Sequence, residues 1–336
     1  MDNTIAECAL RIAEYKNYFK GTMISTKYQA PNHKQISHPP HPSPLPSGER
    51  DGVRGRWALA FGIYLIFGIW KLGLLLFLMV ISMTMGCQRS KAGITVAGST
   101  SVEPFAELLA EEYMHLHPRS HIYVQGGGSS AGIQAVRSGA AQIGMSSRSL
   151  IGREKSLYAV LIARDAIAII VHPKNPVIDL PLVKVREVFT GRIKNWKELG
   201  GADRTITLVT REEGSGTREA FQKLVMGKEE IALEALVQDS NGAIRQVVAG
   251  DPNAIGYISL GLVNEKVRAL KISGVVPDFE NIKNGRYHLV RPFLFVFTGE
   301  PSGEAKSFLD FVMSPEAQKL LTREGLVPAL SKSSGG

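Results

Sequence analysis

Short apolar segments alternate with amphipathic stretches along most of this chain, and this alternation limits the available folds more than any other feature. Apolar residues two apart predict strands, and apolar residues three and four apart predict helices. The expected strands are 94–97, 122–124, 143–145, 166–171, 206–210, 255–258 and 287–297. The expected helices are 105–116, one starting near 133–136, 218–226, 244–249, 304–313 and 315–324. Such alternation predicts an α/β protein with mostly parallel sheets.

The length of 336 residues suggests about two domains. The expected strand that ends near 171 runs into the turn-rich segment 172–176, where the chain is expected to leave one lobe for another. A polar stretch after Leu262 offers a route back. We therefore expect lobe 1 at 93–171 plus 273–336, with lobe 2 inserted at 172–272.

The first 87 residues differ in composition from the rest of the chain. Residues 1–56 include a Pro-rich stretch without hydrophobic period, which is either a disordered leader or sequence upstream of the true start. The apolar run 57–85 is broken only by Lys71 and is long enough for a membrane-spanning signal anchor. Alternatively, 57–87 is a signal peptide that ends in Ser82-Met-Thr-Met-Gly-Cys87. This end resembles a bacterial lipobox, in which Cys87 becomes lipid-modified, although Thr84 stands where leucine is usual. Both interpretations place the body outside the cytoplasmic membrane.

Charge and cysteine content exclude several classes of function. The formal net charge is +8, and residues 1–86, with nine basic and five acidic residues, carry half of it. The remaining excess is too small to indicate nucleic-acid binding. Cys8 and Cys87 are the only cysteines, so a disulfide framework or a zinc site is not expected. No His/Asp/Glu cluster has metal-ligand spacing, so we expect neither a metal nor a cofactor.

Three loops rich in Gly, Ser and Thr each follow an expected strand and precede an expected helix, at 96–104, 124–132 and 210–220. Thr100 and Glu103 have capping-box spacing, and Pro104 suits a first helical turn. Ordinary helix capping explains any one such loop. Free N–H groups at a helix start, with hydroxyl donors beside them, also suit an anion. Arg211 lies four residues before Ser215 and adds a guanidinium that binds oxyanions in forked geometry, so three such loops together indicate an anion site.

Six motifs appear in order from about Gly93 to the C-terminus: Gly98-Ser-Thr-Ser-Val-Glu-Pro104, Gly126-Gly-Gly-Ser-Ser-Ala-Gly-Ile133, Ile143-Gly-Met-Ser-Ser-Arg148, Arg211-Glu-Glu-Gly-Ser-Gly-Thr-Arg218, Ala254-Ile-Gly-Tyr-Ile-Ser259 and Val290-Arg-Pro-Phe-Leu294. They resemble the substrate-binding proteins of bacterial ABC phosphate transporters. The resemblance implies a type II periplasmic-binding-protein fold, with two α/β lobes joined by two crossing segments and the ligand in the cleft. It also implies an extracytoplasmic, lipid-anchored monomer that captures phosphate for a membrane permease and is not an enzyme.

The same resemblance implies a set of phosphate-binding residues: Thr100, Ser101, Ser129, Ser147, Arg211, Ser215, Gly216 and Thr217. Many family members have an aspartate at the position of Ser147, where it accepts the phosphate proton. Asp165 follows an expected strand end, and we hypothesise that it supplies the missing acceptor. An ion pair with Arg164 or another surface cation is the alternative for Asp165.

Two other functions fit parts of the sequence. Residues 128–132 match G-x-S-x-G, the nucleophile elbow of α/β hydrolases, with Ser130 as nucleophile and His172 or His288 as base. That interpretation leaves the loop with Arg211 unexplained. The other alternative keeps the fold and changes the ligand to sulfate, molybdate or another oxyanion. A phosphate-binding P-loop of the G-x-x-x-x-G-K-[ST] type does not occur.

Overall fold

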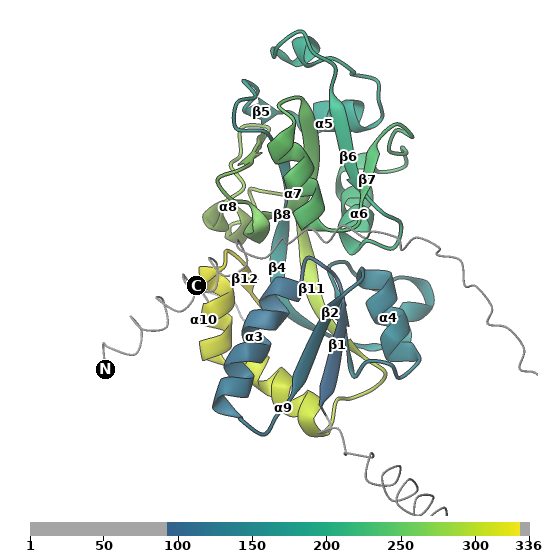
Figure 1. The fold of residues 1–336 in the computed structure, drawn as a ribbon, viewed down its shortest axis with the longest axis vertical. Helices are drawn as coiled ribbons and strands as arrows, with labels where there is room; N and C mark the ends of the chain where they lie inside the picture. Colours follow the sequence, from purple (N-terminus) through teal and green to yellow (C-terminus); the bar gives the residue numbers. More distant parts are fainter. Residues whose placement is uncertain (1–92, 330–336) are drawn as a thin grey trace, which may run out of the picture. The chain divides into compact units, whose positions relative to one another are not determined.

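The structure, a computed structural model, describes residues 93–329 (Figure 1). The expected leader, the apolar run and Cys87 lie outside these residues. Ten strands form one sheet whose main path runs β2-β1-β3-β11-β4-β8-β6-β7, with β12 and β9 pairing onto β4. In the part of the chain that the structure describes, no helix is both long and apolar enough to cross a membrane.

The first lobe is built around the β2 end of this path. Its strands are β1 (Ile94–Gly98), β2 (Ile122–Gly126), β3 (Ile143–Ser146), β11 (Val290–Phe297) and the first part of β4 (Tyr158–Val171). Its helices are α3 (Glu103–Leu116), α4 (Ser129–Arg137), α9 (Gly303–Val312) and α10 (Pro315–Arg323). Phe105 and Leu109 of α3 pack with Phe293 and Phe308 in a buried core. These residues of α3 therefore face the core, as their spacing predicts, whereas Leu116 at the end of the helix is exposed.

The second lobe uses the rest of β4 with β8 (Ala254–Ser259), β6 (Thr207–Arg211) and β7 (Leu236–Gln238). Its helices are α5 (Leu182–Phe189), α6 (Gly216–Phe221), which continues as a π-helix (Gln222–Met226), α7 (Asn241–Gly250) and α8 (Phe279–Lys283). Ile167 and Ile169 of β4 face one core, whereas Ala168 and Ile170 face another that includes Ile244 of α7. Because helices cover both faces, this part of β4 is an unbroken apolar run.

Shorter elements complete the fold. They are the strands β5 (Asp179–Leu180), β9 (Arg268–Ala269), β10 (Lys271–Ile272) and β12 (Val327–Pro328), and the 3-10 helices Gly152–Ser156, Trp196–Leu199 and Leu260–Leu262. β5 and β10 pair with each other outside the main sheet.

The strands β4 and β11 join the lobes. β4 pairs with β11 up to Ala166 and with β8 from Ile167 onward. The second segment that crosses between the lobes leads into β11 (Figure 1). There the backbone N–H of Ile167 donates to the carbonyl of Leu289, just before β11 begins. From this pairing we propose that the chain changes lobe near Ala166 and Val290, whereas the sequence predicts boundaries at 171 and 273.

The expectation of mostly parallel sheets is wrong. β1 pairs in parallel with β2 and β3, and β6 with β7 and β8. β4, however, is antiparallel to β11, β8, β9 and β12. Two strands that carry the chain between the lobes in opposite directions lie side by side in the centre of the sheet, so they pair antiparallel.

Candidate functional site

The loop between β1 and α3 brings three hydroxyl groups toward the second lobe. Ser99 and Ser101 are buried, and Thr100 between them is partly buried. The expected capping box of Thr100 and Glu103 is wrong: α3 starts at Glu103 with Val102 at its N-cap position, and no side chain caps it. The Thr100 hydroxyl instead accepts from the second lobe, through Nη2 of Arg211 at 3.1 Å.

Two more serine side chains come from the start of α4 and from the residue that follows β3. Ser129 is the first residue of α4, and Ser147 directly follows β3. Both are fully buried. The backbone N–H of Ser147 donates to Ser129 Oγ at 3.1 Å, and Ser99 Oγ donates to Ser147 Oγ at 2.8 Å. The first two loops therefore form one hydrogen-bonded cluster within the first lobe.

The third loop belongs to the second lobe. Arg211 ends β6, and Ser215 is the N-cap of α6, where its Oγ accepts from the backbone N–H of Arg218 at 3.3 Å. Thr217 lies in the first turn of α6, and its Oγ1 is 2.8 Å from Oγ of Ser101. This hydrogen bond joins the first and third loops across the two lobes.

The structure thus brings together all eight residues that the resemblance assigns to phosphate, from three loops and the end of β3. Seven are buried, and Thr100 is partly buried. We name them the hydroxyl cluster: Thr100, Ser101, Ser129, Ser147, Arg211, Ser215, Gly216 and Thr217.

Arg211 is the cation of this cluster, and its side chain is only 1% exposed. Nε and Nη2 bind the carboxylate of Glu212, each at 2.8 Å. Nη2 also donates to Thr100 and to the carbonyl of Asp239. Nη1 is buried, and among residues 93–329 it has no hydrogen-bond partner. Because an unpaired buried donor of a charged group is costly, this nitrogen suits an acceptor from a bound anion.

Gly216 lies against the first lobe, and its lack of a side chain permits that approach. A Cβ at this position would overlap Ser129 Oγ and come within 2.7 Å of Ser147 Oγ. We expect Gly216→Ala to hold the lobes apart and to lower phosphate affinity at least about tenfold, a change of about 1.4 kcal/mol. Calorimetric titration measures this loss. Gly242→Ala is the control, because a Cβ there meets only Ser240 Oγ at 3.8 Å; equal affinity in the two variants contradicts the prediction.

Asp165 forms an ion pair, but with a partner that the sequence analysis did not consider. Its Oδ2 accepts from Nε and Nη2 of Arg291 at 2.9 and 2.8 Å, and both side chains are 1% exposed. The alternative for Asp165, an ion pair, is therefore present, but the partner is the buried Arg291 and not Arg164 or a surface cation. Burial raises the pKa of the Asp165 carboxyl, although the positive charge of Arg291 acts to lower it. Burial also lowers the pKa of the Arg291 guanidinium. Nη1 of Arg291 donates to Thr217 at 2.7 Å, which links the pair to the hydroxyl cluster.

Ser130, the candidate hydrolase nucleophile, lies beside a different set of groups. Its Oγ accepts from Nη2 of Arg148 at 3.3 Å and donates to Oε1 of Glu219 at 3.4 Å. Arg148 Nε lies 2.6 Å from Oε2 of Glu219, which is an ionic contact between the lobes. Within residues 93–329 no histidine hydrogen-bonds to Ser130, whose partners are Arg148 and Glu219.

Three residues of this region were missed by the sequence analysis as members of the site. Ser99 links Ser101 to Ser147. Asn241 begins α7 and donates to Ser101 at 2.9 Å. Arg291 lies within a quoted motif, but no role was assigned to it. No single-sequence signal marks Asn241, because an Asn after Ser240 is typical of a helix start.

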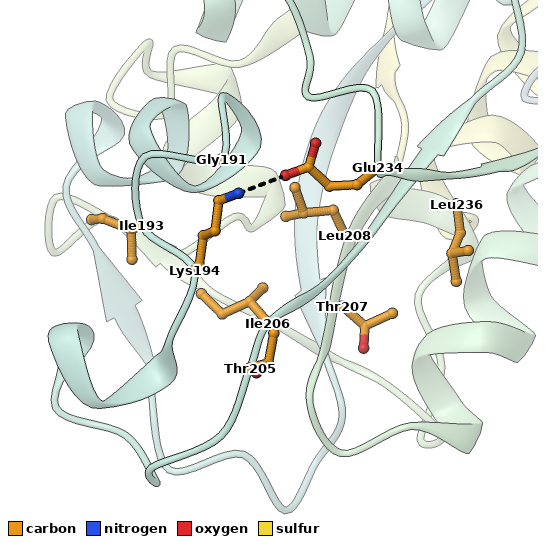
Figure 2. A pocket seen from close by; sticks show the side chains of 9 residues that line it. All are labelled: Gly191, Ile193, Lys194, Thr205, Ile206, Thr207, Leu208, Glu234 and Leu236. Carbon is orange, nitrogen blue, oxygen red and sulfur yellow. Dashed lines mark ion pairs between the residues drawn. The ribbon is translucent and has the colours of Figure 1, made fainter.

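A separate cavity of about 480 Å³ lies in the second lobe beside β6, and Figure 2 shows its lining side chains. The ion pair of Lys194 and Glu234 (3.1 Å) lies between Ile193 and Leu208 in this view. None of its lining residues belongs to the hydroxyl cluster. The described residues contain no group of three or more His, Cys, Asp or Glu side chains suited to a metal ion.

Comparison with known proteins agrees with this fold and cluster. A family model described as "PBP superfamily domain" matches residues 86–316. This match defines the class of the protein as a periplasmic-binding-protein fold, which agrees with the two lobes and the strands that join them.

Individual relatives narrow the class. "Phosphate-binding protein PstS" of Bacillus subtilis is 37% identical over 249 residues, which cover 72% of this chain and 83% of the relative. A crystal structure of a putative phosphate ABC transporter substrate-binding protein with bound phosphate, from Clostridium perfringens, is 44% identical with a TM-score of 0.69 and covers 71% of this chain and 100% of its own. The crystal structure of an ABC-type phosphate transport receptor from Vibrio cholerae is 38% identical, with a TM-score of 0.60. The match covers 70% of this chain and 99% of the receptor chain. The chain belongs to the PstS family of phosphate-binding proteins, so the resemblance and the type II periplasmic-binding-protein fold are confirmed.

Proposed function

We propose that this protein captures inorganic phosphate between its two lobes and delivers it to the membrane permease of an ABC transporter. The observation that carries the proposal is the buried guanidinium of Arg211, whose Nη1 has no hydrogen-bond partner among residues 93–329 while hydroxyl groups of both lobes surround its loop. A tetrahedral oxyanion supplies the acceptors that such a set of donors needs. The names of the relatives support phosphate as this anion.

Each member of the hydroxyl cluster then has a role. Arg211 neutralises charge, and the hydroxyl groups of Thr100, Ser101, Ser129, Ser147 and Thr217 donate to phosphate oxygens. Gly216 presents the first backbone N–H group of α6, and Ser215 is the N-cap of this helix. That Asp165 accepts the hydrogen bond of the phosphate O–H group stays a prediction. Its Oδ1 has no partner among the described residues, whereas Oδ2 is held by Arg291.

The cellular setting follows from the family and from the N-terminal sequence. We propose that the body lies outside the cytoplasmic membrane, that Cys87 is lipid-modified or the apolar run is retained as an anchor, and that the protein acts as a monomer. Capture without turnover is proposed as well, because Ser130 contacts Arg148 and Glu219 rather than a histidine. Ligand contacts from both lobes shift the protein toward its closed form, which the permease recognises.

Calorimetric titration with phosphate, sulfate and molybdate tests the ligand, and small-angle scattering tests closure. We expect saturable phosphate binding and a smaller radius of gyration at saturating phosphate. An unchanged radius of gyration at saturating phosphate contradicts the closure mechanism. Tighter binding of sulfate or molybdate than of phosphate indicates that this other oxyanion is the ligand. Ester hydrolysis that Ser130→Ala abolishes indicates the hydrolase instead.

A further inference from the structure

Arg148 lies at the boundary between the lobes and binds one carboxylate on each side of it. Within the first lobe, its Nη1 and Nη2 donate to the two carboxylate oxygens of Glu154 at 2.6 and 2.9 Å. From the second lobe, Oε2 of Glu219 lies 2.6 Å from Nε of Arg148. The Arg148 side chain is 5% exposed, whereas that of Glu219 is 32% exposed. One buried guanidinium therefore contacts both lobes, through different nitrogens.

The contacts that orient Arg148 toward the second lobe all belong to the first lobe. The carboxylate of Glu154 also accepts from the backbone N–H of Ile151 at 3.0 Å, and Nη1 of Arg148 donates to the carbonyl of Ser149 at 3.1 Å. Hydrogen bonds from Arg148 lower the pKa of the Glu154 carboxyl, so this partner stays charged. Because these contacts do not depend on the second lobe, Arg148 keeps its counter-charge and its orientation when the lobes separate.

Glu219 belongs to the helix whose first turn lies in the hydroxyl cluster. It follows Thr217 by two residues in α6, across the lobe boundary from α4 (Figure 1). Its Oε1 accepts from Ser130 Oγ of α4 at 3.4 Å, and the backbone N–H of Ser130 donates to the carbonyl of Gly214 at 3.2 Å. Glu219 and Arg148 both line a cavity of about 220 Å³. Since Glu219 is partly exposed, water can replace Arg148 as its partner at little cost when the lobes separate.

We propose that Arg148 and Glu219 form a latch between the lobes, which Glu154 holds ready in the first lobe and which raises phosphate affinity by stabilising the closed form. The proposal rests on the proposed function. Neither residue belongs to the hydroxyl cluster, so the latch acts on phosphate through closure. A contact that exists only in the closed form shifts the equilibrium between the open and closed forms toward closure. The latch also gives Ser130 a role, because its hydroxyl bridges Nη2 of Arg148 and Oε1 of Glu219.

Calorimetric titration with phosphate compares the wild type, Glu219→Gln and Glu213→Gln. Glu213 is an exposed carboxylate of the loop that precedes α6 and serves as the matched control. Each substitution removes one negative charge near an anion site, which by itself favours phosphate binding. We therefore expect Glu213→Gln to bind phosphate at least as tightly as the wild type. Glu219→Gln is expected to bind phosphate about threefold to fivefold more weakly, because the ion pair is lost. An affinity of Glu219→Gln that equals or exceeds that of the wild type, or an equal loss in Glu213→Gln, overturns the proposal.

Two further measurements separate the latch from an effect of the substitution on local packing. The loss of affinity in Glu219→Gln is expected to shrink between about 0.05 M and about 0.5 M salt, because salt screens a partly exposed ion pair. In the Arg148→Gln background, Glu219→Gln is expected to cause no further loss. The salt comparison needs no variant of Arg148, so it remains decisive if Arg148→Gln does not fold.

The outcomes distinguish the latch from the proposed function. A loss that is equal at both salt concentrations, or equal with and without Arg148, overturns the latch while phosphate binding stands. Absence of phosphate binding by the wild type overturns the proposed function instead.

Discussion

Arg211→Ala is expected to weaken phosphate binding by at least about 2 kcal/mol, against about 1 kcal/mol for Ser129→Ala. The guanidinium is 1% exposed and is the cation of the hydroxyl cluster, so its loss removes charge-assisted hydrogen bonds. The variant also leaves the carboxylate of Glu212, which Arg211 binds at 2.8 Å, without its partner next to an anion site. Repulsion between this carboxylate and phosphate adds to the loss.

Calorimetric titration compares these variants with Arg204→Ala, which removes an exposed arginine just before β6 and so changes the net charge equally. We expect Arg204→Ala to bind phosphate like the wild type. Equal losses for Arg211→Ala and Ser129→Ala mean that Arg211 does not contact the ligand. A large loss for Arg204→Ala means that long-range charge, and not the buried site, dominates affinity.

The local parts of this site could be predicted from the sequence because each is a short loop between a strand and a helix. Glycine and hydroxyl residues at 96–104, 124–132 and 210–220 mark such loops directly. The contacts of Thr100 show the limit of that reasoning. Its spacing to Glu103 predicts a capping box, whereas in the structure its hydroxyl accepts from Arg211, 111 residues further along the chain. A local pattern carries no information on a competing partner from the other lobe.

The strand that joins the lobes shows the same limit for the fold. The apolar run from Ala166 to Val171 predicts a buried strand, and β4 contains it. β4 starts at Tyr158, however, and Arg164 and Asp165 in the middle of the strand break the apolar pattern. Asp165 is tolerated there only because Arg291 of the neighbouring strand β11 pairs with it. Charge compensation between strands that are more than 120 residues apart cannot be derived from one sequence.

Arg291→Met is expected to lower the free energy of unfolding by about 3–5 kcal/mol, because it leaves Asp165 buried without a counter-charge. Denaturant unfolding without phosphate measures this loss. The double variant Asp165→Asn/Arg291→Met is the control, since it removes both charges and is expected to recover most of the stability. A double variant that is as unstable as Arg291→Met indicates that packing of the long side chain, and not the charge pair, stabilises this junction.

The single variant Asp165→Asn separates the ion pair from the hypothesis that Asp165 accepts the phosphate proton. Asparagine keeps the shape of the side chain and an oxygen for Arg291, so the variant is expected to stay folded at a smaller cost in stability than Arg291→Met. Competition binding then compares phosphate with sulfate, which has no proton to donate at neutral pH. A preference that collapses toward parity supports Asp165 as the acceptor. An unchanged preference for phosphate over sulfate contradicts the hypothesis. In that case Asp165 only positions Arg291 beside Thr217.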